Sequence, residues 1–258
     1  MHSVMRQSDC PIPLVVDREE TENESPRLLV TLCTYNEREN LQQLIPEIQQ
    51  LLPAADLLVI DDNSPDGTGP FVEELAARDT RVHVIQRPGK LGLGSATTAG
   101  FRYGIEKGYD LLVNLDADFS HPPRFIPALL DRSDEADIVI GSRYIEGGEA
   151  VGLSLRRRWM SWSLNLYARA VLRLSTSDNS GSFRCYRVNR LAQVDWSRTQ
   201  ATGYAIQEEI LYRLIQIGAT FLELPISYEE RRFGQTKLNW KEAVMAATIL
   251  LRLRLQRK

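Results

Sequence analysis

Short apolar runs alternate with amphipathic stretches along most of the chain. The runs that predict buried strands lie at residues 28–32, 57–60, 82–85, 111–115 and 138–140. The stretches that predict helices cover residues 37–52, a segment that ends near residue 75 and another that ends near residue 107. Strands that alternate with helices over short loops are typical of a mostly parallel sheet covered on both faces. The sequence therefore predicts an α/β fold.

Polar residues gather where four of the predicted strands end. These clusters are residues 34–37, 61–62, 116–118 and 142–143. In open α/β sheets the ligand crevice lies beyond the carboxyl ends of the strands. We therefore expect the four segments to converge on one edge of the sheet.

The aspartates of this edge suit a cation and a nucleotide. Asp116 and Asp118 are two residues apart, so on an ending strand they point the same way and can hold one divalent cation against a diphosphate. A solvated turn is the alternative. Asp62 either accepts hydrogen bonds from a base or ribose or belongs to a helix cap. Glu37 either faces a ligand or places negative charge at a helix N-terminus.

The second part of the chain is locally basic. Residues 154–190 contain eight arginines and one aspartate, a balance of +7. Within the helix predicted over residues 157–174, an apolar stripe flanked by arginines suits a helix lying in a lipid interface. The stripe consists of Trp159, Trp162, Leu166, Ala170 and Leu174. An ordinary core helix is the alternative. Residues 239–258 repeat the pattern, which favours peripheral membrane contact.

Composition narrows the classes of protein. Of the 258 residues 43% are hydrophobic and 25% charged, with a net charge of -3, which fits a soluble globular protein and excludes disorder for the bulk. Three scattered cysteines without a CxxC pair indicate a reducing compartment. We expect neither a signal peptide nor a transmembrane span, because the longest late apolar run, 243–251, is too short. Residues 1–26 are expected to be a disordered acidic tail.

The glycine-rich segment and the histidines do not match the functional motifs that they resemble. The glycine-rich segment 89–94 follows the third strand and matches neither a dinucleotide fingerprint nor a P-loop, so we expect it to let the backbone pass close to a ligand or a neighbour. The three histidines lie in no triad or zinc pattern. His121, near Asp118, either reaches the site or is structural. The basic region 154–190 carries no nucleic-acid-binding motif, so we expect no nucleic-acid partner.

Several motifs together resemble the catalytic subunits of the dolichol-phosphate (polyprenol-phosphate) mannosyltransferases, which are inverting glycosyltransferases of family 2. The resemblance covers roughly residues 28–251. It is carried by TYNERENL (34–41), IDDNSPDGT (60–68), KLGLGSA (90–96), DADFSHPP (116–123), GSRY (141–144), LRRRWMSWSLN (155–165), DNSGSFRCYR (178–187), GYAIQEE (203–209) and RRFGQTKL (231–238). Each string alone is weak, but their order and spacing are specific.

The resemblance implies a GT-A fold, a Rossmann-like nucleotide-sugar-binding sheet with amphipathic interface helices and no transmembrane span. The domain would cover residues 27–238, with a donor half (27–145) and an acceptor half (146–238), followed by a basic helix at 239–258. It implies GDP-mannose as donor, polyprenyl phosphate as acceptor and Mg²⁺ or Mn²⁺ as cofactor. The protein would lie peripherally on the cytoplasmic side of a membrane, and a small membrane-anchoring subunit is left open.

The resemblance also assigns residues. The metal ligands would be Asp116, Asp118 and Ser120, and the acceptor phosphate would meet Arg157 and Ser161. The catalytic residues would be Asp116, Asp118, Arg143 and Glu209. Donor contacts would come from Cys33, Tyr35, Glu37, Ile60, Asp62, Leu115, Ala117, Arg143, Gln207, Arg231 and Lys237. Two departures hardly disturb this set: Cys33 stands where the family usually has proline, and Ser120 replaces a glutamine found in some members.

Charge suggests the mechanism. A phosphate monoester, with a second pKa of about 6, is already an oxyanion at neutral pH and needs no general base. The site must instead bring two anions together, through a metal and the guanidinium groups of Arg143, Arg157 and Arg231 with Lys237. In-line attack would invert the anomeric carbon. Two alternatives stay open: a polyprenyl-phosphate glucosyltransferase or another family 2 enzyme that uses a UDP-sugar, and a catalytically silent nucleotide-sugar-binding regulatory module.

Overall fold

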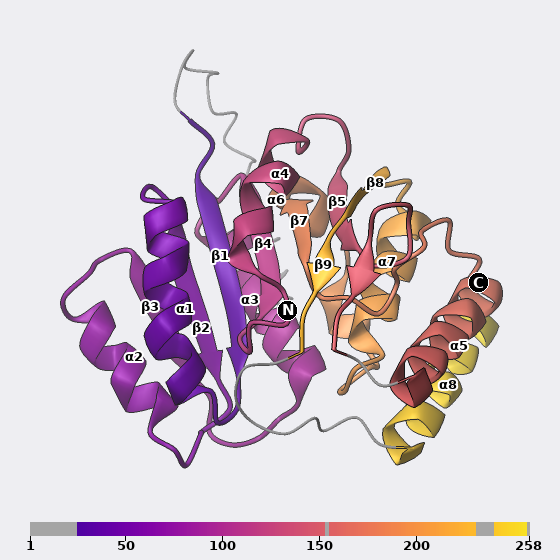
Figure 1. The fold of residues 1–258 in the computed structure, drawn as a ribbon, viewed down its shortest axis with the longest axis horizontal. Coiled ribbons are helices and arrows are strands. Elements are labelled where there is room, and N and C mark those ends of the chain that lie inside the picture. The colour runs from indigo at the N-terminus through magenta and orange to yellow at the C-terminus, as the bar shows by residue number, and fades with distance from the viewer. Residues whose placement is uncertain (1–24, 153–154, 231–239, 257–258) are drawn as a thin grey trace, which may run out of the picture.

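One mixed sheet forms the centre of the molecule. The computed structural model describes residues 25–152, 155–230 and 240–256, so most of the predicted tail lies outside the described residues. Within these ranges seven strands form one sheet in the order β3-β2-β1-β4-β7-β5-β8 (Figure 1). They are β1 (Leu28–Thr34), β2 (Asp56–Asp61), β3 (Val82–Gln86), β4 (Leu111–Asp116), β5 (Ile138–Ser142), β7 (Arg184–Arg187) and β8 (Phe221–Pro225). A separate parallel pair joins β6 (Glu149–Ala150) to β9 (Ser227–Tyr228).

The strands are mostly parallel. Neighbours β3, β2, β1 and β4 run parallel, as do β5 and β8, whereas β7 is antiparallel to both β4 and β5. Consequently β4 and β5 end at the same edge, and the predicted α/β fold is confirmed. The sequence pattern did not reveal β7, which has only four residues. Because β7 follows residue 145 and pairs with strands that precede it, the two predicted halves share one sheet.

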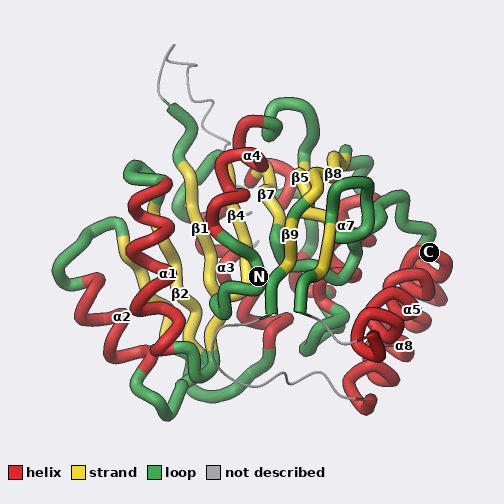
Figure 2. Tube along the Cα trace, viewed as in Figure 1, coloured by secondary structure: helices red, strands yellow, loops and turns green. Residues whose placement is uncertain are grey.

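Helices cover both faces (Figure 2). One face packs against α1, α2 and α4, and the other against α3, α6 and α7. Alternation along the strands explains this: Leu58 and Ile60 of β2 enter one core cluster, whereas Leu57 and Val59 enter the other. The helices are α1 (Arg38–Leu51), α2 (Thr68–Ala76), α3 (Leu93–Glu106), α4 (Ile126–Asp131), α5 (Leu155–Leu172), α6 (Val188–Leu191), α7 (Ile206–Gln216) and α8 (Trp240–Leu255), with 3-10 turns at Pro123–Phe125 and Trp196–Arg198.

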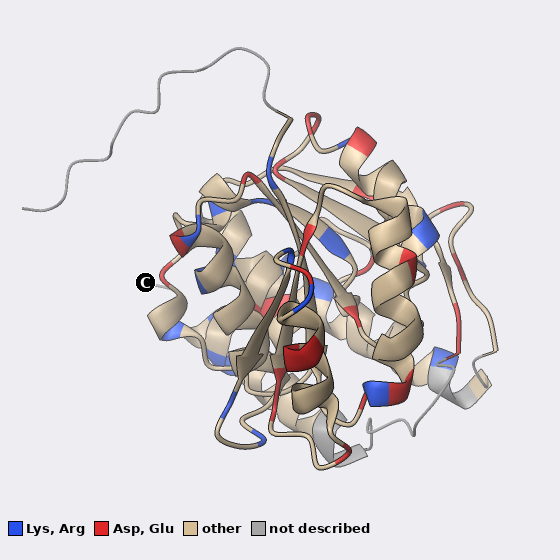
Figure 3. Cartoon of the chain, turned by 90° about the vertical axis from the view of Figure 1, so that its left-hand side faces the viewer, with Lys and Arg blue, Asp and Glu red and all other residues tan. Residues whose placement is uncertain are grey.

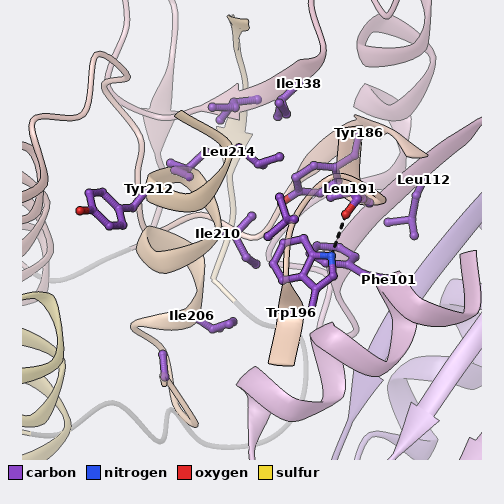
Figure 4. Close-up of a cluster of buried hydrophobic side chains, with 14 of the residues drawn as sticks. Phe101, Leu112, Ile138, Tyr186, Leu191, Trp196, Ile206, Ile210, Tyr212 and Leu214 are labelled. Atoms are coloured by element: carbon purple, nitrogen blue, oxygen red, sulfur yellow. Dashed lines mark hydrogen bonds between the residues drawn. The ribbon is translucent and has the colours of Figure 1, made fainter. Parts of the chain in front are cut away.

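The core on the α3 side joins segments that are distant in the chain (Figure 4). Phe101 of α3 lies against Tyr186 of β7 and Trp196, with ring centroids 5.1 and 5.0 Å apart. The buried Trp196 Nε1 donates a hydrogen bond to the Leu191 carbonyl oxygen at 2.8 Å. This packing fixes the second part of the chain against α3 and the sheet.

Helices α5 and α8 pack side by side at one end of the molecule (Figure 1). The predicted helix 157–174 runs two residues earlier at each end. It ends at Leu172 because Arg173 adopts a left-handed conformation with φ of 56° and the Leu174 N–H bonds back to the Arg169 carbonyl. Within the described residues, none of the helices has the length and apolarity needed to cross a membrane.

The exposed face of α5 is apolar. Trp159, Trp162 and Leu166 are 67%, 47% and 48% exposed, whereas Ala168 and Leu172 are buried against the rest of the molecule. These three residues of the stripe therefore face away from the core, whereas Leu174, beyond the end of α5, is buried in it. The polar Asn165 of the same helix is buried, and its Oδ1 accepts a hydrogen bond from the Asn179 N–H at 2.9 Å.

Candidate active site

A cleft of about 430 Å³ opens at the carboxyl edge of the sheet. It lies among the loops that follow β1, β2, β3 and β4, the segment before α7, and one side of α8. Three of the four predicted polar clusters contribute to it. The described residues that line it are Cys33, Thr34, Tyr35, Glu37, Asp62, Lys90, Leu91, Gly92, Leu93, Ala96, Asp116, Ala117, Asp118, Thr202, Gly203, Tyr204, Ala205, Met245, Ala246 and Ile249.

Asp116 and Asp118 both face this cleft. The Asp116 Oδ1 accepts a hydrogen bond from the Ser182 hydroxyl at 2.7 Å, and its side chain is 39% exposed. The buried Asp118 carboxylate accepts the N–H of Ser120 at 3.0 Å. Each carboxylate is thus oriented by a neighbouring donor, and Asp116 still presents oxygen to the cleft.

The donor set fits a hard divalent cation only in part. Aspartate oxygens are the ligands that Mg²⁺ and Mn²⁺ take, and two of them usually share the ion with water and substrate phosphate. Within the described ranges, no group of three or more His, Cys, Asp or Glu side chains forms a metal cage. Ser120 is fully buried. The arrangement fits an ion that the diphosphate helps to hold, rather than a permanent structural metal.

His121 lies behind the two aspartates. Its buried ring packs against Phe183 and Tyr228, with centroids 5.4 and 5.3 Å away, and its Nδ1 is 3.6 Å from the Asp116 Oδ2. Burial lowers the pKa of His121, against the opposite effect of Asp116, so the ring is neutral at pH 7. His121 therefore lies behind the site as a neutral ring and is not a source of positive charge.

The turn after β1 carries Tyr35 and Glu37. Asn36 has a φ of 62°, and its N–H bonds to the Ser64 hydroxyl at 2.9 Å, so the turn leans toward the loop after β2. The Glu37 carboxylate accepts the Asn40 amide at 2.7 Å. Burial raises the pKa of the neighbouring Cys33 thiol to about 12, so Cys33 is an uncharged part of the cleft floor.

Asp62 organises the glycine-rich loop. Its carboxylate forms a buried ion pair with Arg87 and accepts the Gly92 N–H at 3.0 Å. Arg87 also donates to the Gly92 carbonyl and to the Ser95 hydroxyl, at 3.0 and 2.6 Å. Asp62 therefore shapes the wall of the cleft in addition to lining it.

The glycine-rich loop also meets the segment before α7. The Gly94 N–H donates to the Thr202 carbonyl at 3.0 Å, and a Cβ on Gly94 would lie 1.9 Å from the Ala201 carbonyl oxygen. The expectation of a close backbone approach to a neighbour is confirmed. Glu209 holds the other side of this segment: its buried carboxylate accepts the N–H groups of Gln200 and Ala201, at 3.0 and 2.7 Å, and pairs with Arg213.

Arg143 differs most from its expected place. It follows β5, which β7 separates from β4, and it is not among the described residues that line the cleft. Its guanidinium donates to both carboxylate oxygens of Asp178, each at 2.7 Å, and lies 5.1 Å from the Tyr228 ring. Arg143 is therefore held by Asp178 outside the described lining of the cleft, and its contact with the donor stays a prediction.

The remaining predicted residues fall into three groups. The side chains of Ile60, Leu115 and Gln207 are buried, and Ala117 lines the cleft. The Ser161 hydroxyl lies 2.8 Å from the Tyr144 hydroxyl, which connects α5 to the residue after Arg143. Arg157 belongs to α5, but its side chain, like the whole of Arg231 and Lys237, lies outside the described residues.

The structure adds residues that sequence reasoning did not assign. Lys90 lies at the tip of the glycine-rich loop, Tyr204 precedes α7, and Met245, Ala246 and Ile249 come from α8. Acidic and basic residues are interspersed on the side of the molecule that carries α2 (Figure 3), so no single charged patch there pointed to the site. Lys90 and Tyr204 had a usable signal, since they lie in the KLGLGSA and GYAIQEE strings.

The comparisons with known proteins agree with this geometry. The chain matches the family model "Glycosyl transferase family 2" over residues 29–194. It is 41% identical over 213 residues to an undecaprenyl-phosphate mannosyltransferase of Micrococcus luteus, and this match covers 83% of this chain and 88% of the relative. The chain belongs to glycosyltransferase family 2. This glycosyltransferase is also 40% identical over 232 residues to a polyprenol monophosphomannose synthase of Mycolicibacterium smegmatis, covering 86% and 88% of the two chains.

Solved structures share the fold of this glycosyltransferase. A glucosyl-3-phosphoglycerate synthase from Mycobacterium tuberculosis, in complex with Mn²⁺, UDP and phosphoglyceric acid, matches with a TM-score of 0.62 and 19% identity over 89% of this chain and 77% of that one. A mannosyltransferase from Pyrobaculum calidifontis in complex with GDP-mannose and Mn²⁺ matches with a TM-score of 0.55 and 16% identity, over 91% and 65%. The predicted GT-A architecture is confirmed.

The Arg143–Asp178 pair provides a test of the layer behind the cleft. Burial alone would raise the pKa of Asp178, but the charge and hydrogen bonds of Arg143 outweigh burial and hold that pKa below its ordinary value. Asp178→Asn leaves a buried guanidinium without its counter-ion and should lower the free energy of unfolding by about 3–5 kcal/mol at pH 7. Urea denaturation measures this change.

The pH dependence has a defined sign. A lowered carboxyl pKa stabilises the folded state above the unfolded pKa of about 4, and this stabilisation is lost as the pH falls through the folded value. The difference between wild type and D178N should therefore shrink only below about pH 4. Asp134→Asn, which breaks the exposed Arg187–Asp134 pair, is the matched control and should change little. An equal change in the free energy of unfolding for the two substitutions would contradict a stabilising role of the buried Arg143–Asp178 pair.

Proposed function

We propose that this glycosyltransferase transfers mannose from GDP-mannose to the phosphate of a polyprenyl phosphate, with a divalent cation and with inversion at the anomeric carbon. The observation that carries the proposal is the cleft in which Asp116 and Asp118 face the turn of Tyr35 and Glu37 across the ends of adjacent strands. The names of two relatives, at 40% and 41% identity over most of the chain, support the mannosyl group and the polyprenyl phosphate.

The donor would lie along the sheet edge. Its nucleoside occupies the region of Tyr35, Glu37 and Asp62, and its diphosphate reaches Asp116 and Asp118, which would hold the cation. Bound there, Mg²⁺ or Mn²⁺ neutralises the diphosphate and stabilises it as the leaving group. Ala117 lies at the same strand end, and the side chains of Ile60 and Leu115 shape the edge from within the core.

The acceptor needs no base from the protein. A phosphate monoester is mostly ionised at neutral pH, because its second pKa is about 6, and the described cleft lining contains no histidine. The protein's task is to orient the oxyanion in line with the anomeric carbon and to offset the repulsion between the two anions. We assign that task to Arg157 and Ser161 on α5 and to Arg231 and Lys237. A direct role for Arg143 would require it to exchange Asp178 for a phosphate.

Two predicted residues receive positioning roles. Glu209 fixes the backbone of residues 200–201, which supports the cleft wall at Thr202 and Tyr204. The Gln207 carbonyl accepts a hydrogen bond from the buried Arg184 at 2.9 Å, and its side chain is buried at the start of α7. Both residues would act on the bound sugar indirectly, by positioning residues 200–205, the segment that precedes α7.

The lipid part of the acceptor would meet α5 and α8. Trp159, Trp162 and Leu166 expose apolar surface on α5, and Val244, Met245, Leu251 and Leu255 do so on α8. Met245 also lines the cleft, so the apolar surface of α8 reaches the site itself. A helix pair with exposed tryptophans and arginines suits the interface of a bilayer, and we propose that it rests there while the isoprenoid chain stays in the lipid. A membrane-anchoring subunit stays a prediction.

A transfer assay tests the function. Radiolabelled GDP-mannose with polyprenyl phosphate and Mg²⁺ or Mn²⁺ should give a labelled lipid, and Asp118→Asn should lower the rate by about 100-fold or more, because a ligand of the charge-stabilising ion is lost. Asp131→Asn, on the exposed end of α4, is the control and should leave the rate unchanged. UDP-glucose in place of GDP-mannose tests the alternative donor. The absence of any labelled lipid under either metal would contradict the proposal.

Vesicle binding tests the membrane surface. The Trp159→Ala/Trp162→Ala double variant should reduce binding to vesicles of phosphatidylcholine and phosphatidylglycerol by about tenfold, since two large apolar side chains no longer enter the interface. Sedimentation of the protein with the vesicles measures this. Leu51→Ala removes an exposed apolar side chain from α1 and should not matter. Equal binding of the double variant and wild type would show that this face does not meet the bilayer.

A further inference from the structure

Two polar side chains of α5 face the rest of the molecule. Ser161 and Asn165 are four residues apart, about one turn of the helix, and both form hydrogen bonds with residues outside the helix. Trp162 and Leu166, each the next residue along the chain, are exposed on another side of the helix. Helix α5 thus carries an exposed apolar face, which we propose meets the bilayer, and a polar face that meets the loops beside it.

Asn165 anchors the loop between α5 and β7. Its Oδ1 accepts hydrogen bonds from the Asn179 N–H, at 2.9 Å, and from the Asn179 side-chain amide, at 3.0 Å. Its Nδ2 donates to the Ser177 carbonyl oxygen. Both asparagines are buried, and both lone pairs of the Asn165 oxygen are used. The loop is therefore tied back along the helix from which it emerges.

The far end of the same loop reaches the cleft. Asp178, next to Asn179 in the chain, holds the Arg143 guanidinium. Three residues beyond Asn179, the Ser182 hydroxyl donates a hydrogen bond to the Asp116 Oδ1 at 2.7 Å. The loop therefore connects α5 directly to the aspartate that would hold the cation.

Contacts with the sheet fix this loop in place. Glu223 of β8 accepts both N–H groups of residues 177–178, at 2.7 and 3.0 Å. The Asn179 carbonyl accepts a hydrogen bond from the buried Arg184 guanidinium of β7 at 2.7 Å. Helix α5 itself packs mainly against α8. Because apolar packing is not directional, whereas hydrogen bonds are, the bonds of Asn165 set the rotation and height of α5 relative to the sheet.

We infer that Asn165 is a positioning residue for the transfer reaction, an inference that rests on the proposed function. It fixes α5, and with it Arg157 and Ser161, relative to the cleft. The hydrogen bond between Ser161 and Tyr144 is a second polar link, but it uses the hydroxyl that we assign to the acceptor phosphate. Asn165 supplies the link for which the acceptor does not compete. The position of α5 matters because a misplacement of about 1 Å can slow a reaction by about 100-fold.

Steady-state kinetics with GDP-mannose and polyprenyl phosphate in vesicles test this role. Asn165→Ala should lower kcat by about tenfold or more, since the acceptor phosphate is no longer held in line with the donor. The affinity for GDP with Mn²⁺, measured by calorimetry, and the binding to vesicles should stay within about twofold of wild type, because neither depends on that alignment. Asn189→Ala, which truncates an exposed asparagine of α6, is the matched control and should leave all three values unchanged.

A conservative variant keeps the test independent of folding. Asn165→Asp retains the oxygen that accepts from Asn179 and loses only the donor to the Ser177 carbonyl, so kcat should fall by about threefold, less than in N165A. Circular dichroism at the assay temperature shows whether each variant is folded. If N165A does not fold, an unchanged kcat of N165D would overturn the inference.

The outcomes separate the inference from the proposed function. A wild-type kcat in folded N165A would overturn the role of Asn165 and leave the proposed function standing. Equal losses of kcat, GDP affinity and vesicle binding would overturn that role too, because Asn165 would then support the fold in general. If wild type formed no mannosylated lipid, the proposed function would fail and the inference with it.

Discussion

Repulsion between carboxylates is the constraint that governs this molecule. The parallel strands place Glu37, Asp62, Asp116 and Asp118 along one edge of the sheet. A hydrogen-bond donor orients each of these carboxylates, although their charges repel one another. Asn40, Arg87, Ser182 and the Ser120 N–H supply these donors. Asp62 is neutralised by the full charge of Arg87. An edge that gathers four carboxylates suits a cation together with the anion that it accompanies.

The second part of the chain completes the cleft from the other side. Residues 200–205 lie against the glycine-rich loop, because Gly92 and Gly94 leave room for their backbone and Glu209 fixes it from behind. Helix α8 adds an apolar wall that continues into an exposed surface. One cleft therefore joins an acidic end, suited to a nucleotide and a metal, with an apolar end, suited to a lipid, and the proposed reaction needs both.

The sequence predicted the elements that depend on local pattern. The strands at residues 28–32, 57–60 and 111–115 were located within two residues, and so was α5, because burial and period follow from neighbours in the chain. Long-range pairing was not visible in the sequence: β7 inserts between β4 and β5, and Arg143, which follows β5, pairs with Asp178. Lys90 was missed for the same reason, since its partner Tyr35 lies on another loop.

We propose that Asp116 and Asp118 bind a nucleoside diphosphate only together with a cation. Titration calorimetry with GDP, in Mn²⁺ and in EDTA, tests this for wild type and for D116N/D118N. Mn²⁺ should tighten GDP binding to wild type by at least about tenfold and leave the variant unaffected, because the carboxylates repel the diphosphate unless an ion lies between them. Equal affinity of wild type with and without Mn²⁺ would contradict it.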